Sequence, residues 1–297
     1  MANVDIAVLN TKTYSDTLEI AAQKTRSAFR QGSVEIGCTG EGHRPISFIG
    51  KTVVRERTTR GAQKTIADTN HTGRWISRTA YISDSEIIDD MDKRLTALDP
   101  TSGYHKNQMA AMWRKFDDDF IAKLHGDALT GKDGTSTTSF PGANTVTSTD
   151  GFIIADLLDA LQLLQENEVI LDMNDPEELY LAMKPAHFRE FVKMNEVSNK
   201  DYGNSFYDGQ TYQVGSWMGI NIIVDNHLLG AVGVTEMALW AKSGMYTGIW
   251  EDVHGTVTQD DGKEGEPMLC TMYGDFGMTR VEEEKVIKII TDERTKA

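Results

Sequence analysis

Three consecutive carboxylates, Asp117, Asp118 and Asp119, have the residue type and spacing that first suggest a metal site or acid–base chemistry. Successive residues on a helix are about 100° apart, so three adjacent carboxylates fan across about 200° and cannot converge on one ion. Apolar residues around them recur at three- and four-residue steps, as on one face of a helix: Met109, Met112, Trp113, Phe116, Phe120, Leu124 and Ala128. The pattern predicts an amphipathic helix over residues 101–129 with the aspartates on a solvated face, and ion pairs four residues apart, such as Lys115 with Asp119.

Other candidate motifs for chemistry are incomplete. The stretch FIGKT contains the GKT of a phosphate-binding loop, but the position five residues before Gly50 holds Pro45 instead of glycine. The seven histidines and the two cysteines, Cys38 and Cys270, show no metal-ligand spacing, and no GxSxG elbow is present. The sequence therefore predicts no catalytic residue, no metal site and no cofactor.

Composition places the chain among ordinary folded proteins. It has 297 residues, of which 39% are hydrophobic and 25% charged, enough for one elaborated domain or two subdomains. It contains no run of about 18 apolar residues, so no membrane span is expected. The first residues lack a basic region followed by an apolar core, so no signal peptide is expected. Only two cysteines occur, which favours a reducing cytoplasm.

Charge is unevenly distributed along the chain. The net charge is −15, which disfavours sequence-independent binding to nucleic acid. Residues 51–78 nevertheless hold seven basic and two acidic residues, a segment charge of +5, so the other residues carry −20. Five acids follow within residues 84–92. A solvated hairpin accounts for the basic segment, and so does a basic arm that reaches an acidic surface on another copy of the protein.

The hydrophobic pattern predicts helices and strands mixed without regular βαβ alternation, which is an α+β chain. Residues 46–59 and 66–83 lie on either side of RGAQKT, and in both stretches the side chains alternate between two faces as in a β-strand. The pattern predicts a long two-stranded hairpin over 46–83. An isolated hairpin is marginal in water, so a neighbouring subunit is the expected source of packing. Three more helices are expected: residues 13–31, residues 155–169 and one that begins at Pro185. The second of these would point Leu157, Leu158, Leu161 and Leu164 inward.

The further expected strands are 177–183, 211–226 in two parts, 237–242, 246–261 and two closing strands. Residues 133–151 and 196–210 are expected to be exposed loops.

The order of these parts resembles that of tailed-phage major capsid proteins with the HK97-type fold. Three phrases carry the resemblance: RWISRTAYISDSEIIDDMD followed by the QMAAMWRKFDDDFIAKLHGDAL helix, YLAMKPAHFREF, and YQVGSWMGINIIVDNHL. The first resembles the passage of that fold from its β-hairpin to its long spine helix. The second resembles a strand followed by a helix that begins at proline, in the axial domain of that fold. The third resembles a glycine-flanked strand that ends at Asn226. The resemblance covers residues 35 to 290 as an ensemble, since this family has no catalytic signature.

The resemblance implies an α+β, HK97-like capsid fold with an N-terminal arm, an extended β-hairpin loop, a long spine helix in a peripheral domain and a mixed α/β axial domain. Its domains would be the arm (1–35), the extended loop (36–83), the peripheral domain (84–150), the axial domain (151–265) and a return to the peripheral domain (266–297). The protein would then be a structural, non-enzymatic component that assembles as pentamers and hexamers into the icosahedral head around the double-stranded DNA genome.

The resemblance also implies partners and contacts. The partners would be further copies of the chain, a separate scaffolding protein, a portal protein and, where present, a decoration protein, with DNA enclosed without sequence-specific binding and with no membrane. The protein would be assembled in the host cytoplasm and reside in the virion. Basic residues of the loop would meet acids of the next subunit, and the expected intersubunit residues are Arg55, Arg57, Arg60, Lys64, Arg74, Trp75, Arg78, Asp84, Glu86, Asp89, Asp117 and Asp118.

Three alternatives stay open from the sequence. One is the shell of an encapsulin-like, cargo-holding nanocompartment with the same fold. Another is a carboxylate-dependent hydrolase that uses Asp117 or Asp172 with His125, although no spacing supports it. The third is a tail or connector component, which would form rings or tubes instead of closed shells.

Overall fold

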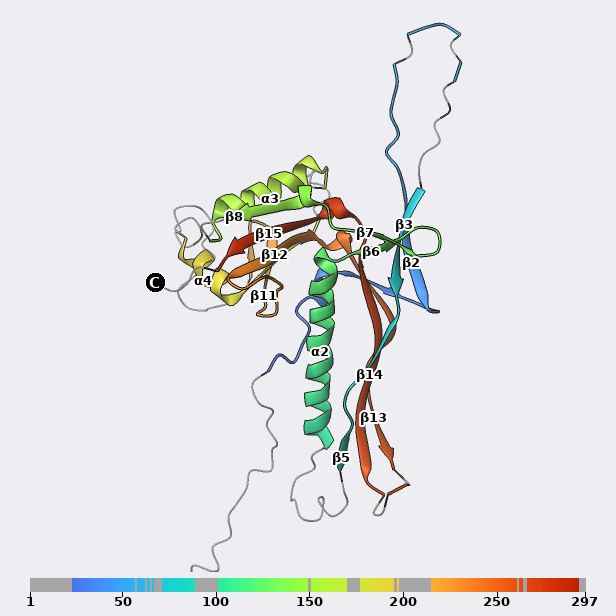
Figure 1. The fold of residues 1–297 in the computed structure, drawn as a ribbon, viewed down its shortest axis with the longest axis vertical. Coiled ribbons are helices and arrows are strands. Elements are labelled where there is room, and N and C mark those ends of the chain that lie inside the picture. The colour runs from blue at the N-terminus through green and yellow to red at the C-terminus, as the bar shows by residue number, and fades with distance from the viewer. Residues whose placement is uncertain are drawn as a thin grey trace, which may run out of the picture. The chain divides into compact units, whose positions relative to one another are not determined.

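The structure is a computed structural model that describes residues 23–56, 58–61, 63, 64, 66, 71–88, 101–148, 151–169, 177–194, 197, 215–260, 262, 263 and 266–293 (Figure 1). The chain divides into two compact units. The first unit comprises Met1–Arg26, Tyr81–Trp113 and Val253–Gly274, and the second comprises Ser27–Ala80, Arg114–Asp252 and Asp275–Ala297. The mixture of helices and three sheets confirms the α+β class.

The long amphipathic helix is α2, which spans Thr101–His125. Met112, Phe116, Phe120 and Leu124 of the predicted apolar stripe are each at most 4% exposed. Met109 is 38% exposed, so the prediction is wrong at that position. The expected end at residue 129 is wrong, because Ala128–Thr130 forms strand β6, which pairs with two other strands.

A six-stranded sheet forms the largest layer of the second unit. Its strand order is β10-β11-β9-β12-β15-β8. The strands are β10 (Ser216–Trp217), β11 (Ile220–Val224), β9 (Leu179–Met183), β12 (Val234–Ala241), β15 (Val286–Asp292) and β8 (Thr145–Ser148). Every residue of β9 is buried, as expected for a central strand covered on both faces.

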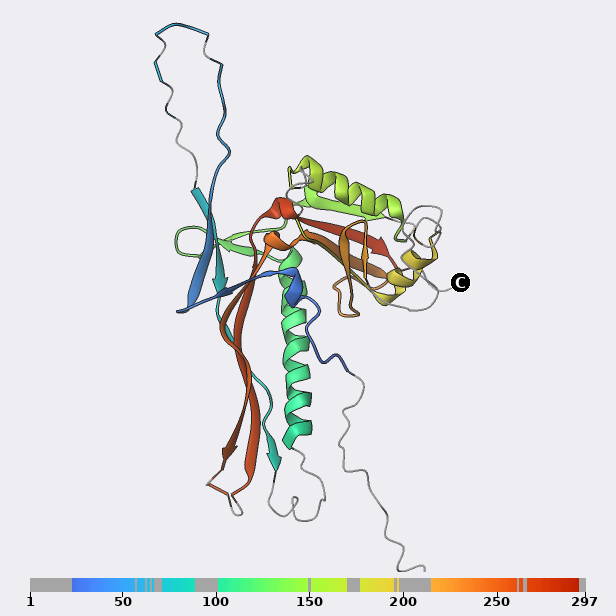
Figure 2. The ribbon, with the colours of Figure 1, turned by 180° about the vertical axis from the view of Figure 1, so that it is seen from behind.

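Two helices accompany this sheet. Helix α3 (Ile154–Glu166) packs against β15 and β8, and Figure 2 shows it lying along the sheet. Leu157 and Leu164 point inward as predicted, whereas Leu158 is 46% exposed, so that part of the prediction is wrong. Helix α4 (Pro185–Lys193) begins at the proline, confirming the expected helix start.

A tight turn joins β10 to β11, as the sequence predicted near Gly219. Met218 and Gly219 have φ of 51° and 78°, and consecutive residues with positive φ suit a two-residue hairpin turn. Glycine adopts this conformation without a steric cost, whereas Met218 does so with its side chain 59% exposed.

The predicted hairpin of residues 46–83 is shorter than expected and divides between two sheets. Strand β2 (Gly42–Ile49) pairs antiparallel with β3 (His71–Ser77), and residues 50–56 are not a strand. Strand β4 (Thr79–Ile82) belongs to another sheet, next to β14. A Cβ on Gly277 of β14 would lie 2.1 Å from the Ser77 carbonyl oxygen, so glycine is required where the chain changes sheet.

The four-stranded sheet has the order β2-β3-β6-β7, in which β7 is Ser136–Thr138. The five-stranded sheet has the order β1-β13-β14-β4, and β5 also pairs with β14. Its other members are β1 (Val34–Gly37), β13 (Met245–Gln259), β14 (Met268–Arg280) and β5 (Glu86–Ile88). The long closing strands predicted from the sequence are thereby confirmed.

Two expected loop or helix segments differ from the structure. Residues 133–151 are not simply an exposed connection, because they contain β7 and β8. Residues 23–29 are not helical, and a single 3-10 turn at Arg30–Gly32 replaces the end of the expected helix 13–31, whose earlier residues lie outside the described part. The expected loop at 196–210 likewise falls outside the described residues except Val197.

An aromatic cluster forms the core of the second unit. Trp240 of β12 is fully buried and stacks on Phe29 and Tyr180, with ring centroids 6.0 Å and 5.8 Å away. Phe120 of α2 lies 5.4 Å from Phe29 and 5.8 Å from Trp240.

No helix in the described part of the chain is long and apolar enough to cross a membrane.

Candidate assembly surfaces

The loop between β2 and β3 exposes apolar side chains that the subunit does not cover. Val53, Val54 and Ile66 are 79%, 94% and 93% exposed. Figures 1 and 2 show the described residues of this loop running out beyond the two strands, with no other described helix or strand of the second unit beside its far end. From here on, the extended loop denotes residues 50–66 of the loop expected over 36–83.

The extended loop is also basic. Lys51, Arg55, Arg60 and Lys64 are exposed, while Arg57 lies outside the described residues. Lys51 forms an ion pair with Glu168, just after α3, and this contact raises the pKa of Lys51 and lowers that of Glu168. Since both side chains are exposed, water and salt screen the pair, and it orients the start of the loop only weakly.

Arg74 and Trp75 form the base of the extended loop inside the subunit. Arg74 Nη2 donates to both carboxylate oxygens of Glu283 at 2.6 Å, and the Arg74 side chain is 9% exposed. Trp75 Nε1 donates to the Gly131 carbonyl at 2.9 Å. Both residues therefore already have partners within their own chain.

Arg78 occupies the point where β3 gives way to β4. Its Nε donates to Asp275 Oδ2 at 2.8 Å, and a second guanidinium nitrogen contacts the same oxygen. The Arg78 side chain is 48% exposed, whereas that of Asp275 is 9% exposed. The guanidinium thus neutralises a buried carboxylate of its own subunit while keeping one side open to solvent.

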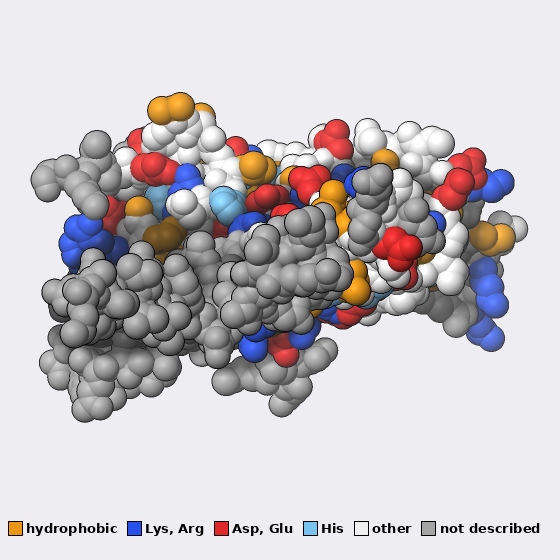
Figure 3. All heavy atoms as spheres, turned by 90° about the horizontal axis from the view of Figure 1, so that it is seen from below, with side chains coloured by type: hydrophobic (Ala, Val, Ile, Leu, Met, Phe, Trp, Pro, Cys, Tyr) orange, Lys and Arg blue, Asp and Glu red, His pale blue; other side chains and the backbone are white. Residues whose placement is uncertain are grey.

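The acidic residues expected at contacts fall into three groups. Asp84 and Glu86 are exposed, and Asp89 lies outside the described residues. Asp118 is half exposed, with His227 Nδ1 3.5 Å from its carboxylate. Figure 3 shows both acidic and basic side chains among the described residues of one face.

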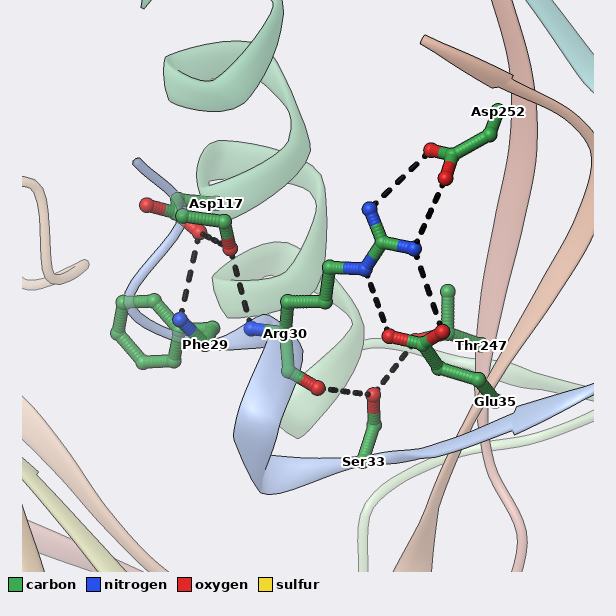
Figure 4. Close-up of polar contacts among 8 residues, drawn as sticks. Phe29, Arg30, Ser33, Glu35, Asp117, Thr247 and Asp252 are labelled. Atoms are coloured by element: carbon green, nitrogen blue, oxygen red, sulfur yellow. Dashed lines mark hydrogen bonds and ion pairs between the residues drawn. The ribbon is translucent and has the colours of Figure 1, made fainter. Parts of the chain in front are cut away.

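Asp117 is completely buried, so the reading of all three aspartates as a solvated face is wrong at this position. Its carboxylate accepts a hydrogen bond from Ser27 Oγ at 2.5 Å and from the backbone N–H groups of Ala28 and Phe29 at 3.3 Å and 3.4 Å. Figure 4 shows the contact between Phe29 and Asp117. The predicted solvent-side ion pair is confirmed on the opposite side of the helix, where Lys115 Nζ lies 2.7 Å from Asp119.

Arg30 fixes the next part of the same segment. Its guanidinium donates to Glu35 at 2.6 Å and 3.2 Å, and to both oxygens of Asp252 at 3.1 Å (Figure 4). The hydrogen bond to Glu35 and the contact with Asp252 raise the pKa of Arg30. Ser33 and Thr247 share a buried hydroxyl hydrogen bond of 2.8 Å.

These contacts make residues 27–33 an anchor for the N-terminal segment. Phe29 is inserted into the aromatic core, and Trp240 Nε1 donates to the Gly32 carbonyl at 2.7 Å. A Cβ at Gly32 would lie 2.9 Å from the Trp240 ring, so the close approach requires glycine. Sequence reasoning missed this anchor, although the apolar Phe29 among polar residues was a signal.

The part of the five-stranded sheet that lies in the first unit exposes apolar side chains, which sequence reasoning also missed. Ile87 of β5 lies opposite Leu269 of β14, and Ser85 and Thr271 share a hydrogen bond of 2.7 Å. Because alternate residues of a strand share a face, Tyr273 lies on this side as well. Ile87 and Tyr273 are 50% and 37% exposed, and the acids Asp84 and Glu86 lie in the same segment as Ile87.

The described fold is found in solved capsid structures. The chain is similar to the capsid of the cyanophage P-SCSP1u, with a TM-score of 0.73 and 18% identity over 98% of this chain and 96% of that chain. It is similar to the capsid of the cyanophage Pam1, with a TM-score of 0.72 and 12% identity over 100% of both chains. It is also similar to the mature capsid of bacteriophage PhiM1, with a TM-score of 0.69 and 14% identity over 95% and 92%.

At these identities the structural matches show the fold, which is the HK97-like capsid fold expected from the sequence. A comparison with curated protein sequences finds no match. The family model described as phage capsid protein matches residues 7–293, which is nearly the whole chain.

The chain therefore belongs to the phage capsid protein family. It is a structural protein of the phage shell and a component of the virion, and it self-assembles into capsomers. The functional sites of such a protein are the surfaces by which one copy meets the next, which is why exposed apolar groups and their supporting contacts matter here.

Proposed function

We propose that the chain forms pentamers and hexamers that close into the icosahedral head of a tailed phage around its double-stranded DNA, and that the extended loop of each copy lies on the exposed sheet face of a neighbour. The observation that carries this proposal is the almost complete exposure of Val53, Val54 and Ile66. Large apolar side chains in that state mark a surface that another molecule covers.

The two proposed surfaces are complementary in chemistry. Val53, Val54 and Ile66 of the loop would meet the face around Ile87 and Tyr273. The basic loop residues would reach past the sheet edge formed by β5 to Asp84 and Glu86, which alternate with Ile87 and so point to the other face. Burial of one such aliphatic side chain contributes about 1.5–3 kcal/mol. An exposed ion pair contributes only about 0.2–1 kcal/mol, so burial supplies most of the strength and charge selects the register.

The expected intersubunit residues now divide by their exposure. Arg55, Arg60, Lys64, Asp84, Glu86 and Asp118 are exposed and stay in the proposed contact. Arg74, Trp75, Arg78 and Asp117 have partners inside their own subunit, and for them we propose a supporting role beneath the contact. Arg57 and Asp89 stay in the proposal on the basis of their charge alone.

Further partners belong to the same proposal. We infer a separate scaffolding protein, a portal protein at one vertex and room for a decoration protein, with assembly in the host cytoplasm. DNA would be enclosed without sequence-specific binding, since the chain has a net charge of −15 and the packaged genome is also anionic. Co-expression with the neighbouring structural genes of the same phage, followed by purification of particles, tests each partner by its presence.

A charge exchange tests the loop contact. Reversing the loop with Arg55→Glu and Arg60→Glu is expected to suppress assembly, measured by light scattering and electron microscopy, without changing the unfolding midpoint of the subunit. Adding Asp84→Lys and Glu86→Lys to the same chain is expected to restore particles, because attraction is recovered with the signs exchanged. Lack of rescue by a well-folded quadruple variant would count against these partners.

An apolar substitution tests the burial contribution separately. Val54→Asp is expected to abolish assembly, since it would bury an unpaired carboxylate in the contact. Val54→Ile is the matched control, because it keeps an apolar side chain at the same position, and it is expected to assemble as the unmodified chain does. Equal assembly by both variants would show that this residue stays in solvent in the shell.

A further inference from the structure

A buried cluster of two guanidinium groups and one carboxylate lies beneath the extended loop. The Glu283 carboxylate is held by Arg74 at 2.6 Å, and the Arg280 guanidinium lies 3.9 Å from the same carboxylate. The side chains of Arg74, Glu283 and Arg280 are 9%, 16% and 0% exposed. Solvent is thus largely excluded from all three charges.

The cluster joins the strand that carries the extended loop to the six-stranded sheet. Arg74 lies in β3, where it is opposite Thr130 of β6. Glu283 lies in the 3-10 turn Glu283–Lys285, which leads directly into β15 of the six-stranded sheet. Its backbone carbonyl accepts a hydrogen bond of 2.6 Å from Asn144, so the turn itself is fixed. The carboxylate of Glu283 is therefore the link between a firm turn and the loop-bearing strand.

Arg280 is fixed on one side and unsatisfied on the other. One terminal nitrogen donates to the carbonyl oxygens of Leu124 and Gly126, at 2.9 Å and 2.8 Å, at the end of α2. The guanidinium also lies 5.1 Å from the centre of the Phe140 ring. Its Nε and second terminal nitrogen have no hydrogen-bond partner within the described part of the chain, and the same holds for Arg74 Nε.

One carboxylate therefore serves two buried cations, and each arginine has spare donors. Burial lowers the pKa of Arg280, but a guanidinium stays protonated in proteins, so both cations persist. Buried donors without partners favour any rearrangement that supplies an acceptor. Transfer of Glu283 from Arg74 to Arg280 exchanges one arginine–carboxylate pair for another, so the two arrangements are similar in kind.

We propose that Glu283 is a shared carboxylate that alternates between Arg74 and Arg280 and thereby gives the extended loop two directions relative to the six-stranded sheet. When Glu283 moves to Arg280, the Arg74 side chain keeps only its hydrogen bond of 3.1 Å to Thr130. Strand β3 stays paired with β2 and β6, and the four-stranded sheet that carries the loop loses this tie to the six-stranded sheet and can turn with the loop. The proposal rests on the proposed function, because pentamers and hexamers present a neighbour at different angles and the loop must meet both.

Hydrogen exchange of the unassembled, full-length subunit tests this hinge. Arg74→Gln and Glu283→Gln each remove the pair seen here, and exchange of the β2–β3 amides is expected to rise at least tenfold. Arg280→Lys keeps a positive charge near the α2 carbonyls but removes the guanidinium that competes with Arg74 for Glu283. The exchange rate of the β2–β3 amides is therefore expected to stay at or below that of the unmodified chain. Arg30→Gln, which breaks a different arginine–carboxylate cluster, is the control and should leave β2–β3 unchanged. A rise in Arg280→Lys equal to that in Arg74→Gln would overturn the proposal, because both residues would then only stabilise one structure.

A distance measurement on the unmodified cluster is independent of whether the Arg280 variant folds. Spin labels at Val54→Cys and Leu158→Cys occupy exposed positions, whereas the native Cys38 and Cys270 are buried. Two populated label distances are expected in the subunit, and one narrow distance would overturn the hinge. Both measurements use free subunits. A single label distance would therefore overturn the hinge without bearing on shell formation. If two label distances are found but the chain forms no particles, the result counts only against the proposed function.

Discussion

Asp117 and the residues around it decide how firmly the N-terminal segment is held. We predict that Asp117→Asn lowers the free energy of unfolding by about 2 kcal/mol. The carboxylate accepts hydrogen bonds from three donors, whereas an asparagine side chain would turn its own N–H group toward some of them. Hydrogen bonds to a buried charge contribute about 1.5–3 kcal/mol. Urea denaturation followed by tryptophan fluorescence measures the change.

The neighbouring Asp118→Asn is the matched control for that substitution. Its carboxylate is half exposed, so the free energy of unfolding is expected to change by less than about 0.5 kcal/mol. Equal destabilisation by the two variants would contradict the assignment of Asp117 as the anchor of residues 27–29.

His125 makes subunit stability depend on pH. Burial lowers its pKa below the ordinary value, while the hydrogen bond to Glu236 partly opposes that shift. The unfolded chain therefore binds the proton first, so the contribution of His125 is present above the unfolded pKa near 6.5 and is lost as the pH falls below it. Hydrogen bonding from His125 and the ion pair with Lys288 lower the pKa of Glu236 to about 2, so that carboxylate changes stability only at more acidic pH.

We predict that His125→Asn flattens the fall in unfolding free energy between about pH 7 and pH 5. Asparagine keeps a donor toward Glu236 but has no group that titrates in this range. Denaturation curves at several pH values for both proteins give the comparison. Parallel pH profiles would mean that His125 carries no proton difference between the folded and unfolded states.

At the scale of elements, the short segment around Phe29 is tied to α2 and β12 by its aromatic side chain. Phe29 is fully buried between Phe120 and Trp240. We predict that Phe29→Ala costs about 3–5 kcal/mol of unfolding free energy, the usual loss for a buried phenylalanine. Thermal or urea unfolding measures it, with Tyr273→Ala at a partly exposed position expected to cost much less.

The elements that the sequence predicted well are those with a strong local period. The three- and four-residue spacing of Met112, Phe116, Phe120 and Leu124 located α2, and Pro185 located the start of α4. The strands β6, β7 and β8 were missed because they are only three or four residues long, and their stability comes from pairing with other strands. The predicted hairpin was too long because alternation continues past Arg78, where the chain passes to another sheet.

The individual contacts were beyond the reach of local pattern. Asp117 meets Ser27 across 90 positions, and Arg74 meets Glu283 across 209 positions. Charge counting identified the basic segment correctly, but it did not distinguish arginines that are bound within the subunit from those on the exposed loop. That distinction depends on burial, which only the folded chain defines.

At the scale of the whole molecule, the separation of charge predicts how assembly responds to salt. The Debye length falls from about 10 Å at 0.1 M to about 3 Å at 1 M, which screens the attraction between exposed loop cations and acids. We predict that the initial rate of assembly falls several-fold over this range, while the final yield of particles changes little because apolar burial persists. Time-resolved light scattering and a final particle count measure the two quantities. A yield that falls in step with the rate would mean that ion pairs, not burial, hold the shell together.

Cryo-electron microscopy of particles formed by the purified chain, alone and with a scaffolding protein, tests the central claim most directly. Closed icosahedral shells of pentamers and hexamers are predicted, with density for residues 50–66 of each copy lying across the sheet face of its neighbour. Monomers, open tubes or rings at every concentration, or an extended loop folded back on its own subunit in a closed shell, would contradict it.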